Sequence, residues 1–191
     1  MTDAVSICNL ALQRVGAKSI ANLSENSTAG RACNRIYTQA RDSELRSHDW
    51  SFARERVKIA ADSTAPTFGF TKRYQLPADC VRIQPTNGTN ATPNQEDFQV
   101  EGRFVLTDTG SPINLVYTKR VTDEETFDDL FVELLIARIA MDIAEKVTQS
   151  NTKKDEATLH YKSVQREARR INAFERSPQQ PPTDDWEDAR L

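Results

Sequence analysis

The sequence has little cysteine and almost no excess of charge of either sign. Its 191 residues include three cysteines, which stand far apart, form no Cys-x-x-Cys pair and offer no disulfide framework. Such sparse cysteines are typical of a protein that works in a reducing compartment. Lysine and arginine number 25 against 28 aspartates and glutamates, which gives a net charge of -3. A chain whose main task is to bind duplex DNA usually has a clear basic excess, so the composition argues against that task.

Targeting signals and long hydrophobic runs are also missing. The first four residues lack the basic start and apolar stretch of a signal peptide, so we expect no secretion. The most hydrophobic segment, residues 130–144, is interrupted by Glu133, Arg138 and Asp142 and is not expected to span a bilayer. Hydrophobic residues still make up 38% of the chain, which is enough for one folded body and excludes a wholly disordered chain.

The residue types that usually carry catalysis are scarce. Only two histidines are present, His48 and His160, and no His-Glu-x-x-His, Gly-x-Ser-x-Gly or glycine-rich phosphate-binding motif occurs. Cys8 and Cys33 lie on apolar faces of expected helices, where thiols act as small hydrophobic groups. Cys80 precedes an alternating strand and could be either buried or reactive. We therefore expect neither an enzyme nor a bound metal or cofactor.

Hydrophobic periodicity predicts two helices in the first third of the chain. Residues 3–15 form the first, and Gly16 suits the left-handed conformation that ends many helices. Residues 28–48 form the second, with Arg41 on its outer face. The expected inner face of the second helix consists of small or apolar residues: Ala29, Ala32, Cys33, Ile36, Tyr37, Ala40 and Leu45.

The middle third changes to a period of two, which is typical of strands. Residues 80–83 read as a strand that Pro85 ends, residues 98–106 as a hairpin that turns at Glu101-Gly102-Arg103, and residues 113–117 as a further strand. Between them, residues 86–97 contain only one apolar residue, Ala91. Such a loop is either mobile or ordered by a partner.

The last third returns to helical periodicity. A long helix is expected to begin at Asp123-Glu124-Glu125, because acidic side chains suit the positive end of the helix dipole. A capping box of Thr152 and Asp155 is expected to start the fourth helix. From residue 177 the chain is rich in proline and acids and has too little apolar content to fold alone.

These elements predict an α+β fold that is mainly α: a four-helix bundle with a β-rich insertion between the second and third helices and an extended C-terminal tail. Residues 1–58 hold the first two helices and residues 59–121 the β-rich region. Residues 122–176 hold the last two helices and residues 177–191 the tail.

Charge is distributed unevenly along this plan. Residues 1–60 carry a net charge of +3, residues 61–122 are neutral, and residues 123–191 carry -6. Residues 123–133 contain six acids and no base, whereas the fourth helix is locally basic. The basic helix could contact phosphates, form a solvated outer face, or bind an acidic patch on a neighbouring copy.

Several segments, taken in order, resemble the tubular tail protein A family of short-tailed, T7-like bacteriophages. These segments cover most of residues 4–175, and the order of the matches carries the resemblance. They are Ala11-Leu12-Gln13-Arg14-Val15-Gly16-Ala17, residues 33–37, His48-Asp49-Trp50-Ser51-Phe52-Ala53-Arg54, Tyr74-Gln75-Leu76-Pro77-Ala78-Asp79-Cys80-Val81-Arg82, Val100-Glu101-Gly102, Tyr117 with Thr122-Asp123, Phe127-Asp128-Asp129-Leu130-Phe131, and residues 137–150.

The resemblance implies a head-to-tail adaptor in the virion, assembled in the host bacterial cytoplasm as a ring of twelve copies. Its partners would be other copies of itself, the portal protein and the tail nozzle protein, with double-stranded DNA passing through the channel without specific binding. It implies no membrane and no small-molecule ligand.

The candidate interface residues fall into three groups. An isolated Trp in an acidic tail is a common interface anchor, and the polar loop 86–97 and the basic fourth helix supply the other groups. The candidates are Asn87, Asn90 and Asn94 in the loop, Arg166, Arg169 and Arg170 in the fourth helix, and Asp184, Asp185 and Trp186 in the tail. The alternative functions are another phage neck or tail completion protein (a stopper or terminator), a DNA-binding module and, last, an enzyme.

Overall fold

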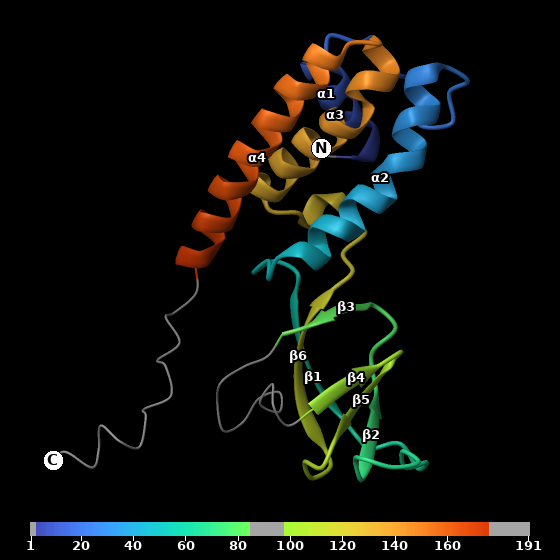
Figure 1. The fold of residues 1–191 in the computed structure, drawn as a ribbon, viewed down its shortest axis with the longest axis vertical. Helices are drawn as coiled ribbons and strands as arrows, with labels where there is room; N and C mark the ends of the chain where they lie inside the picture. Colours follow the sequence, from blue (N-terminus) through green and yellow to red (C-terminus); the bar gives the residue numbers. More distant parts are fainter. Residues whose placement is uncertain (1–2, 85–97, 176–191) are drawn as a thin grey trace, which may run out of the picture. The chain divides into compact units, whose positions relative to one another are not determined.

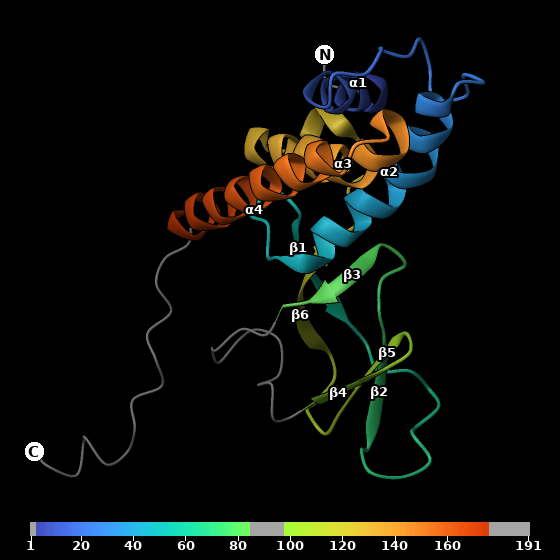
Figure 2. The same ribbon diagram turned by 45° about the horizontal axis from the view of Figure 1, so that its top comes forward.

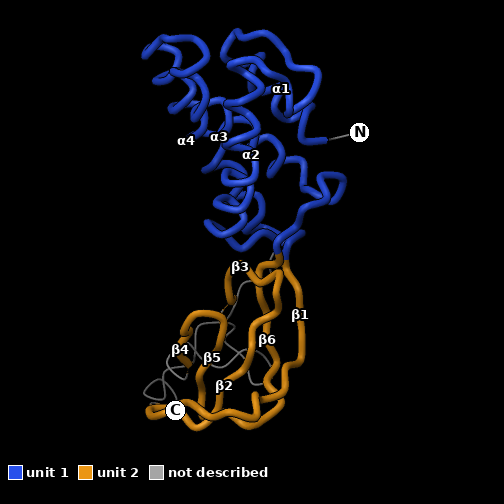
Figure 3. The backbone as a smooth tube through the Cα atoms, turned by 90° about the vertical axis from the view of Figure 1, so that its right-hand side faces the viewer, with its two compact units in different colours: residues 1–53, 120–175 blue, residues 54–119, 176–191 orange. Residues whose placement is uncertain are grey.

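A computed structural model describes residues 3–84 and 98–175 of the chain. Its elements fall into two compact units, which Figure 3 colours separately: residues 1–53 with 120–175, and residues 54–119. Every described helix belongs to the first unit and every described strand to the second. We call them the helical unit and the β unit. The two are divided at residues 53/54 and 119/120, whereas the sequence pattern suggested divisions near 58/59 and 121/122.

The helical unit contains α1 (Ala4–Arg14), α2 (Thr28–Ser47), α3 (Asp129–Thr148) and α4 (Asn151–Phe174), with the short 3-10 helix η1 (Glu124–Thr126) before α3. Local chemistry explains where the first two begin. The carboxylate of Asp3 accepts from the amide of Ser6, and the hydroxyl of Ser27 accepts from the amide of Gly30. Gly16 follows α1 with φ of 76°, as its position after an apolar helix predicts.

The prediction of a four-helix bundle is wrong. The fold is a mixed α+β fold that combines four α-helices with two three-stranded antiparallel sheets. In the helical unit α3 is the centre, because α1, α2 and α4 each pack mainly on it (Figures 1 and 2). The reason is the distribution of apolar residues. α3 buries nine side chains around its circumference, whereas the 24 residues of α4 include only two that are buried, Ala168 and Asn172.

The starts of α3 and α4 also differ from the expectation. Asp123 caps η1 rather than α3, because Phe127 is extended and the chain becomes α-helical only after Asp128, whose carboxylate accepts from two amides of the first turn of α3. The cap of α4 is Ser150 and not a Thr152 capping box, since the Ser150 hydroxyl accepts from the Lys153 amide. The acidic residues that the sequence placed at these two helix starts, residues 123–125 for α3 and Asp155 for α4, therefore lie outside the first turns.

Arg41 was expected on the outer face of α2 but is buried, with 7% of its surface exposed. Its guanidinium lies 2.9 Å from the Asp42 carboxylate, which also pairs with Arg120 at 3.1 Å. The long methylene stem of an arginine can cover apolar surface while its charge stays paired, and the periodicity of α2 does not distinguish that position from an exposed one.

Four aromatic rings form one end of the helical core. Trp50 and Phe131 are 1% and 0% exposed, and their ring centroids lie 5.2 Å apart in an edge-to-face arrangement. Phe52 and Phe127 both pack on Phe131, at 5.0 and 5.2 Å. Edge-to-face and tilted contacts of this kind add to the apolar area that the rings bury. Within the segment from His48 to Arg54, Trp50 and Phe52 therefore serve as anchors of the helical core.

The β unit consists of two antiparallel sheets with the strand orders β1-β6-β3 and β2-β5-β4. Its strands are β1 (Arg54–Ile59), β2 (Lys72–Gln75), β3 (Cys80–Ile83), β4 (Phe98–Glu101), β5 (Phe104–Thr107) and β6 (Ile113–Lys119). The predicted hairpin is confirmed: β4 pairs with β5 from Phe98↔Thr107 to Glu101↔Phe104, and Gly102 turns the chain with φ of 58°. Both sheets contribute to one core, which contains Tyr74, Leu76, Cys80, Val105, Ile113, Leu115 and Tyr117.

The sequence revealed neither β1 nor β2, and β1 shows why. Its sequence, Arg-Glu-Arg-Val-Lys-Ile, has only two apolar residues and was assigned to the helical part of the chain. The strand is held by its partner, since all six residues pair with β6, from Arg54↔Thr118 to Ile59↔Ile113. β6 itself is largely buried and supplies the apolar content that β1 lacks.

Candidate interaction surface

The thiols are core groups rather than nucleophiles. Cys8 and Cys33 are fully buried between α1 and α2, and the hydrogen bond with Cys33 together with burial raises the pKa of the Cys8 thiol far above its usual range. The sequence left open whether Cys80 is buried or reactive. With 8% of its surface exposed, it is a buried residue. In the part of the chain that the structure describes, no three histidine, cysteine or carboxylate side chains are grouped to hold a metal ion.

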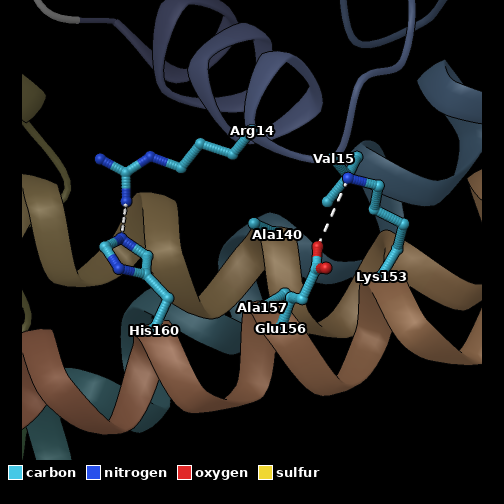
Figure 4. Close-up of a pocket in the computed structure, with 7 residues that line it drawn as sticks. All are labelled: Arg14, Val15, Ala140, Lys153, Glu156, Ala157 and His160. Atoms are coloured by element: carbon cyan, nitrogen blue, oxygen red, sulfur yellow. Dashed lines mark hydrogen bonds and ion pairs between the residues drawn. The ribbon is translucent and has the colours of Figure 1, made fainter.

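The helical unit has a hollow of about 350 Å³ between the end of α1 and the start of α4 (Figure 4). Its charged side chains pair with one another. Arg14 donates to a ring nitrogen of His160 and to Glu133, and Lys153 lies 3.4 Å from Glu156. The ring nitrogen of His160 that faces the hollow is therefore already engaged by Arg14, and Glu156 by Lys153. The hollow is lined by side chains that stabilise the packing of α4 on the helical unit.

The structure describes three of the predicted interface residues, the arginines of α4. Arg166 and Arg170 are exposed, and the Arg166 Nε donates to the backbone of Lys162. Arg169 is half-buried and donates to the Ser47 hydroxyl at 3.1 Å, so it faces α2 and supports the fold. The other six candidates lie outside the described residues: Asn87, Asn90, Asn94, Asp184, Asp185 and Trp186.

The two exposed arginines belong to a larger stripe on α4. Residues three or four apart share one side of a helix, and Leu159, Lys162, Arg166, Arg170 and Phe174 follow this spacing and are all exposed. Leu159 is 69% and Phe174 81% exposed, so a large apolar side chain stands near each end with three cations between them. We call these five residues the α4 outer face. The apolar members were not recognised from the sequence, although the same spacing could have revealed them.

The acidic run at residues 123–133 is only partly available as a partner for such a face. Glu124 accepts a hydrogen bond from the Tyr37 hydroxyl at 2.9 Å, Asp128 caps α3, and Glu133 pairs with Arg14. The remaining acids, Asp123, Glu125 and Asp129, are exposed. Three of the six carboxylates therefore stabilise the helical unit. The three exposed ones, of which Asp123 also caps η1, form an acidic patch beside η1 and the start of α3.

A buried carboxylate holds α4 in place. Glu44 on α2 is 1% exposed and accepts from the Tyr161 hydroxyl of α4 at 2.7 Å and from Arg138 of α3 at 3.0 Å. Arg138 also pairs with Asp142 at 2.8 Å, so its charge is shared between two carboxylates. Burial and the nearby Glu44 raise the pKa of Tyr161 to about 12, which keeps the phenol protonated as a donor.

A second polar contact fixes the other end of α4. Asn172 is 7% exposed and uses both halves of its amide. Its oxygen accepts from the amide and the hydroxyl of Ser51 at 2.9 and 3.0 Å, and its nitrogen donates to the Asp49 carbonyl at 2.8 Å. Because only two residues of α4 are buried, these polar contacts help to position the α4 outer face.

None of the described helices is long and apolar enough to cross a membrane. Comparison with models of protein families and with curated proteins finds no match to this chain. Its function must therefore be inferred from its own residues and surfaces.

Proposed function

We propose that the chain is a structural subunit of a bacteriophage virion, a head-to-tail adaptor that assembles into a ring between the portal and the tail nozzle and surrounds the exiting DNA. The α4 outer face is the observation that carries the proposal. Two large apolar side chains exposed on one helical stripe suit an interface, where such residues act as anchors. The ordered resemblance of residues 4–175 to tail adaptor proteins supports the same assignment.

The chemistry of the face favours another copy of the same chain as its partner. Lys162, Arg166 and Arg170 are complementary to the exposed acids of the η1 patch, Asp123 and Asp129 among them. Since the two patches are different surfaces of one molecule, a contact between them is head-to-tail. Repeated head-to-tail contacts build a ring when the rotation closes. Opposite charges at the edge set the register, while Leu159 and Phe174 supply buried apolar area.

The test measures the assembly state by mass photometry and negative-stain microscopy, with the chain alone and mixed with portal rings from the same phage. The wild-type chain should form rings in at least one of these conditions. The double variant Leu159→Asp/Phe174→Asp should stay monomeric, since each substitution places a carboxylate where an apolar contact is needed. Arg170→Glu should weaken assembly about tenfold, and mixing it with Asp129→Lys should restore mixed rings, because the charges are then exchanged across the contact.

A matched control is Arg56→Glu, which makes the same charge change at an exposed position on β1. It should assemble like the wild type. A chain that remains monomeric with and without portal rings would contradict the adaptor. Rings that tolerate all the α4 substitutions would contradict the proposed contact. Binding of duplex DNA that weakens steeply with salt would favour the DNA-binding alternative instead.

A further inference from the structure

The loop that joins β1 to β2, residues 60–71, is firmly anchored at both ends. At its start, Asp62 accepts from the Thr64 amide at 3.0 Å and pairs with Arg73 at 3.0 Å. At its end, the amide and hydroxyl of Thr71 donate to Asp108 at 2.7 and 2.8 Å. The hydrogen bond from the Thr64 amide lowers the pKa of Asp62, and that from the Thr71 amide lowers the pKa of Asp108. The anchors are therefore charged at neutral pH.

The tip of this anchored loop presents an aromatic ring to solvent. Phe68 is 87% exposed, and Gly69 turns the chain behind it with φ of 89°, a conformation that side-chain-bearing residues rarely adopt. Because the loop is held at both ends, the exposure of Phe68 is not the result of a frayed segment. An ordered apolar side chain of this kind has less conformational entropy to lose on binding than one on a loose loop.

Phe68 stands at the edge of a hollow of about 380 Å³ between the loop and one face of the β2-β5-β4 sheet. From the sheet, the hollow is lined by Arg73, Gln99, Glu101, Phe104 and Leu106. The guanidinium of Arg73 lies 4.7 Å from the centre of the Phe104 ring and is already neutralised by Asp62. Glu101 is exposed and has no ion-pair partner among the described residues. The uncompensated charge of the hollow is therefore negative.

The hollow lies beside a strand edge. In the described parts of the chain β4 pairs only with β5, and three of its four residues are exposed. An extended peptide can add to such an edge through main-chain hydrogen bonds, and every second side chain of the peptide then points to the same face of the sheet. Gln99 and Glu101 share the face of the hollow, since they lie opposite Leu106 and Phe104 in the pairing register.

We propose that this hollow, with Phe68 as its anchor, binds an extended segment of a partner protein in which an arginine or lysine stands between apolar residues. The segment adds to β4, its cation pairs with Glu101, and its apolar side chains pack on Phe68 and Phe104. Guanidinium and ammonium groups suit a site that combines a carboxylate with aromatic faces. This site is independent of the α4 outer face and does not require that the chain form a ring.

The probe is a fluorescein-labelled peptide of sequence Val-Thr-Arg-Thr-Val, which places the arginine and both valines on one side of an extended chain. Its counterpart has glutamate in place of arginine. Fluorescence anisotropy with the full chain should show that the arginine peptide binds about tenfold more tightly than the glutamate peptide. Phe68→Ala should weaken the arginine peptide about tenfold, as expected for an anchor residue. Glu101→Lys should reverse the preference between the two peptides.

Matched controls come from exposed residues that belong to neither proposed surface. Leu10→Ala shortens an exposed apolar side chain on α1, and Glu55→Lys makes the same charge reversal on β1; both should bind the arginine peptide like the wild type. Circular dichroism should be unchanged in Phe68→Ala, because an exposed ring contributes little to folding. Equal binding of the two peptides, absence of saturable binding, or indifference to Phe68→Ala would overturn the proposal. So would self-association that Phe68→Ala abolishes, since the occupant would then be a second copy.

Discussion

The buried Glu44 allows a sharp test of how α4 is held on the helical unit. A double-mutant cycle of Glu44→Ala and Tyr161→Phe measures how strongly the two side chains are coupled. Glu44 has 1% of its surface exposed and receives hydrogen bonds from Tyr161 at 2.7 Å and from Arg138 at 3.0 Å. If the Tyr161 hydroxyl stabilises the fold by donating to this carboxylate, its removal should matter much less once the carboxylate is gone.

The structure sets the size of each effect. Removing one partner of a buried ion pair costs about 3–5 kcal/mol, and Glu44→Ala should fall near 3 because Arg138 keeps Asp142 at 2.8 Å. A hydrogen bond to a charged group contributes about 1.5–3 kcal/mol, and Tyr161→Phe should cost about 2 because Tyr161 is only half-buried. The double variant should lose about 3.5 kcal/mol, short of additivity by about 1.5.

Urea unfolding followed by circular dichroism at 222 nm is a suitable assay, because all described helices belong to the helical unit. The free energy of unfolding of the four proteins then gives the coupling directly. Glu167→Ala, an exposed glutamate on α4, is the control and should change stability by less than about 0.5 kcal/mol. Losses that add within about 0.5 kcal/mol would contradict the proposed contact, since Glu44 and Tyr161 would then act independently.

Three further predictions address the tyrosines, the far end of α4 and the Phe68 loop. All four tyrosines have a raised pKa, so in an absorbance titration of the native protein each should ionise at a higher pH than in denaturant, where all four should titrate together near 10. Tyr161 should ionise at about 12, and stability should fall as the pH rises above 10, because the unfolded chain loses these protons first. Asn172→Leu should lower the free energy of unfolding by about 3 kcal/mol in the same urea assay, since it leaves the Ser51 and Asp49 groups unpaired, and a loss below 1 would count against that role. The hydrogen bonds from Thr71 lower the pKa of Asp108, so the contribution of this contact to stability is fully present above pH 3.8 and is lost as the pH falls through the lower pKa of the folded state. Amide spectra of the loop should show this loss as a transition below pH 3.8, and Asp108→Asn should remove the transition.

The sequence predicted best those elements whose own residues carry a strong period. α1, α2 and the β4–β5 hairpin were placed within a few residues, because each has regular apolar spacing and a local stop such as Gly16 or Gly102. β1 and β2 were missed because each has few apolar residues of its own and is held by its pairing with a neighbouring strand, β6 or β5. The bundle was wrong for a related reason: periodicity shows that a helix has an apolar side, but not that three helices share α3 as their common partner.

The interface residues of α4 could be predicted only where their position depends on the local spacing of residues along the helix. Arg166 and Arg170 were chosen as exposed bases on α4, and both are exposed. Arg169 has the same residue type but faces α2, and this depends on the crossing of two helices that are distant in sequence. Glu44 could not be recognised, because its partners lie 94 and 117 residues further along the chain. Phe68 was visible only as an aromatic residue between Pro66 and Gly69.

The distribution of charge indicates that apolar side chains supply most of the affinity at both proposed surfaces, the α4 outer face and the hollow beside Phe68. Of the six acids between residues 123 and 133, three hold contacts inside the helical unit and a fourth, Asp123, caps η1, so the run is a weaker electrostatic partner than its sequence suggests. In the β unit, the charge of Arg73 is neutralised by Asp62. Exposed ion pairs contribute little free energy and are screened by salt. The affinity of each contact must therefore come mainly from Leu159 and Phe174 in one unit and Phe68 in the other, with the remaining charges selecting the partner. Both contacts should accordingly persist at salt concentrations that release a protein held by DNA phosphates.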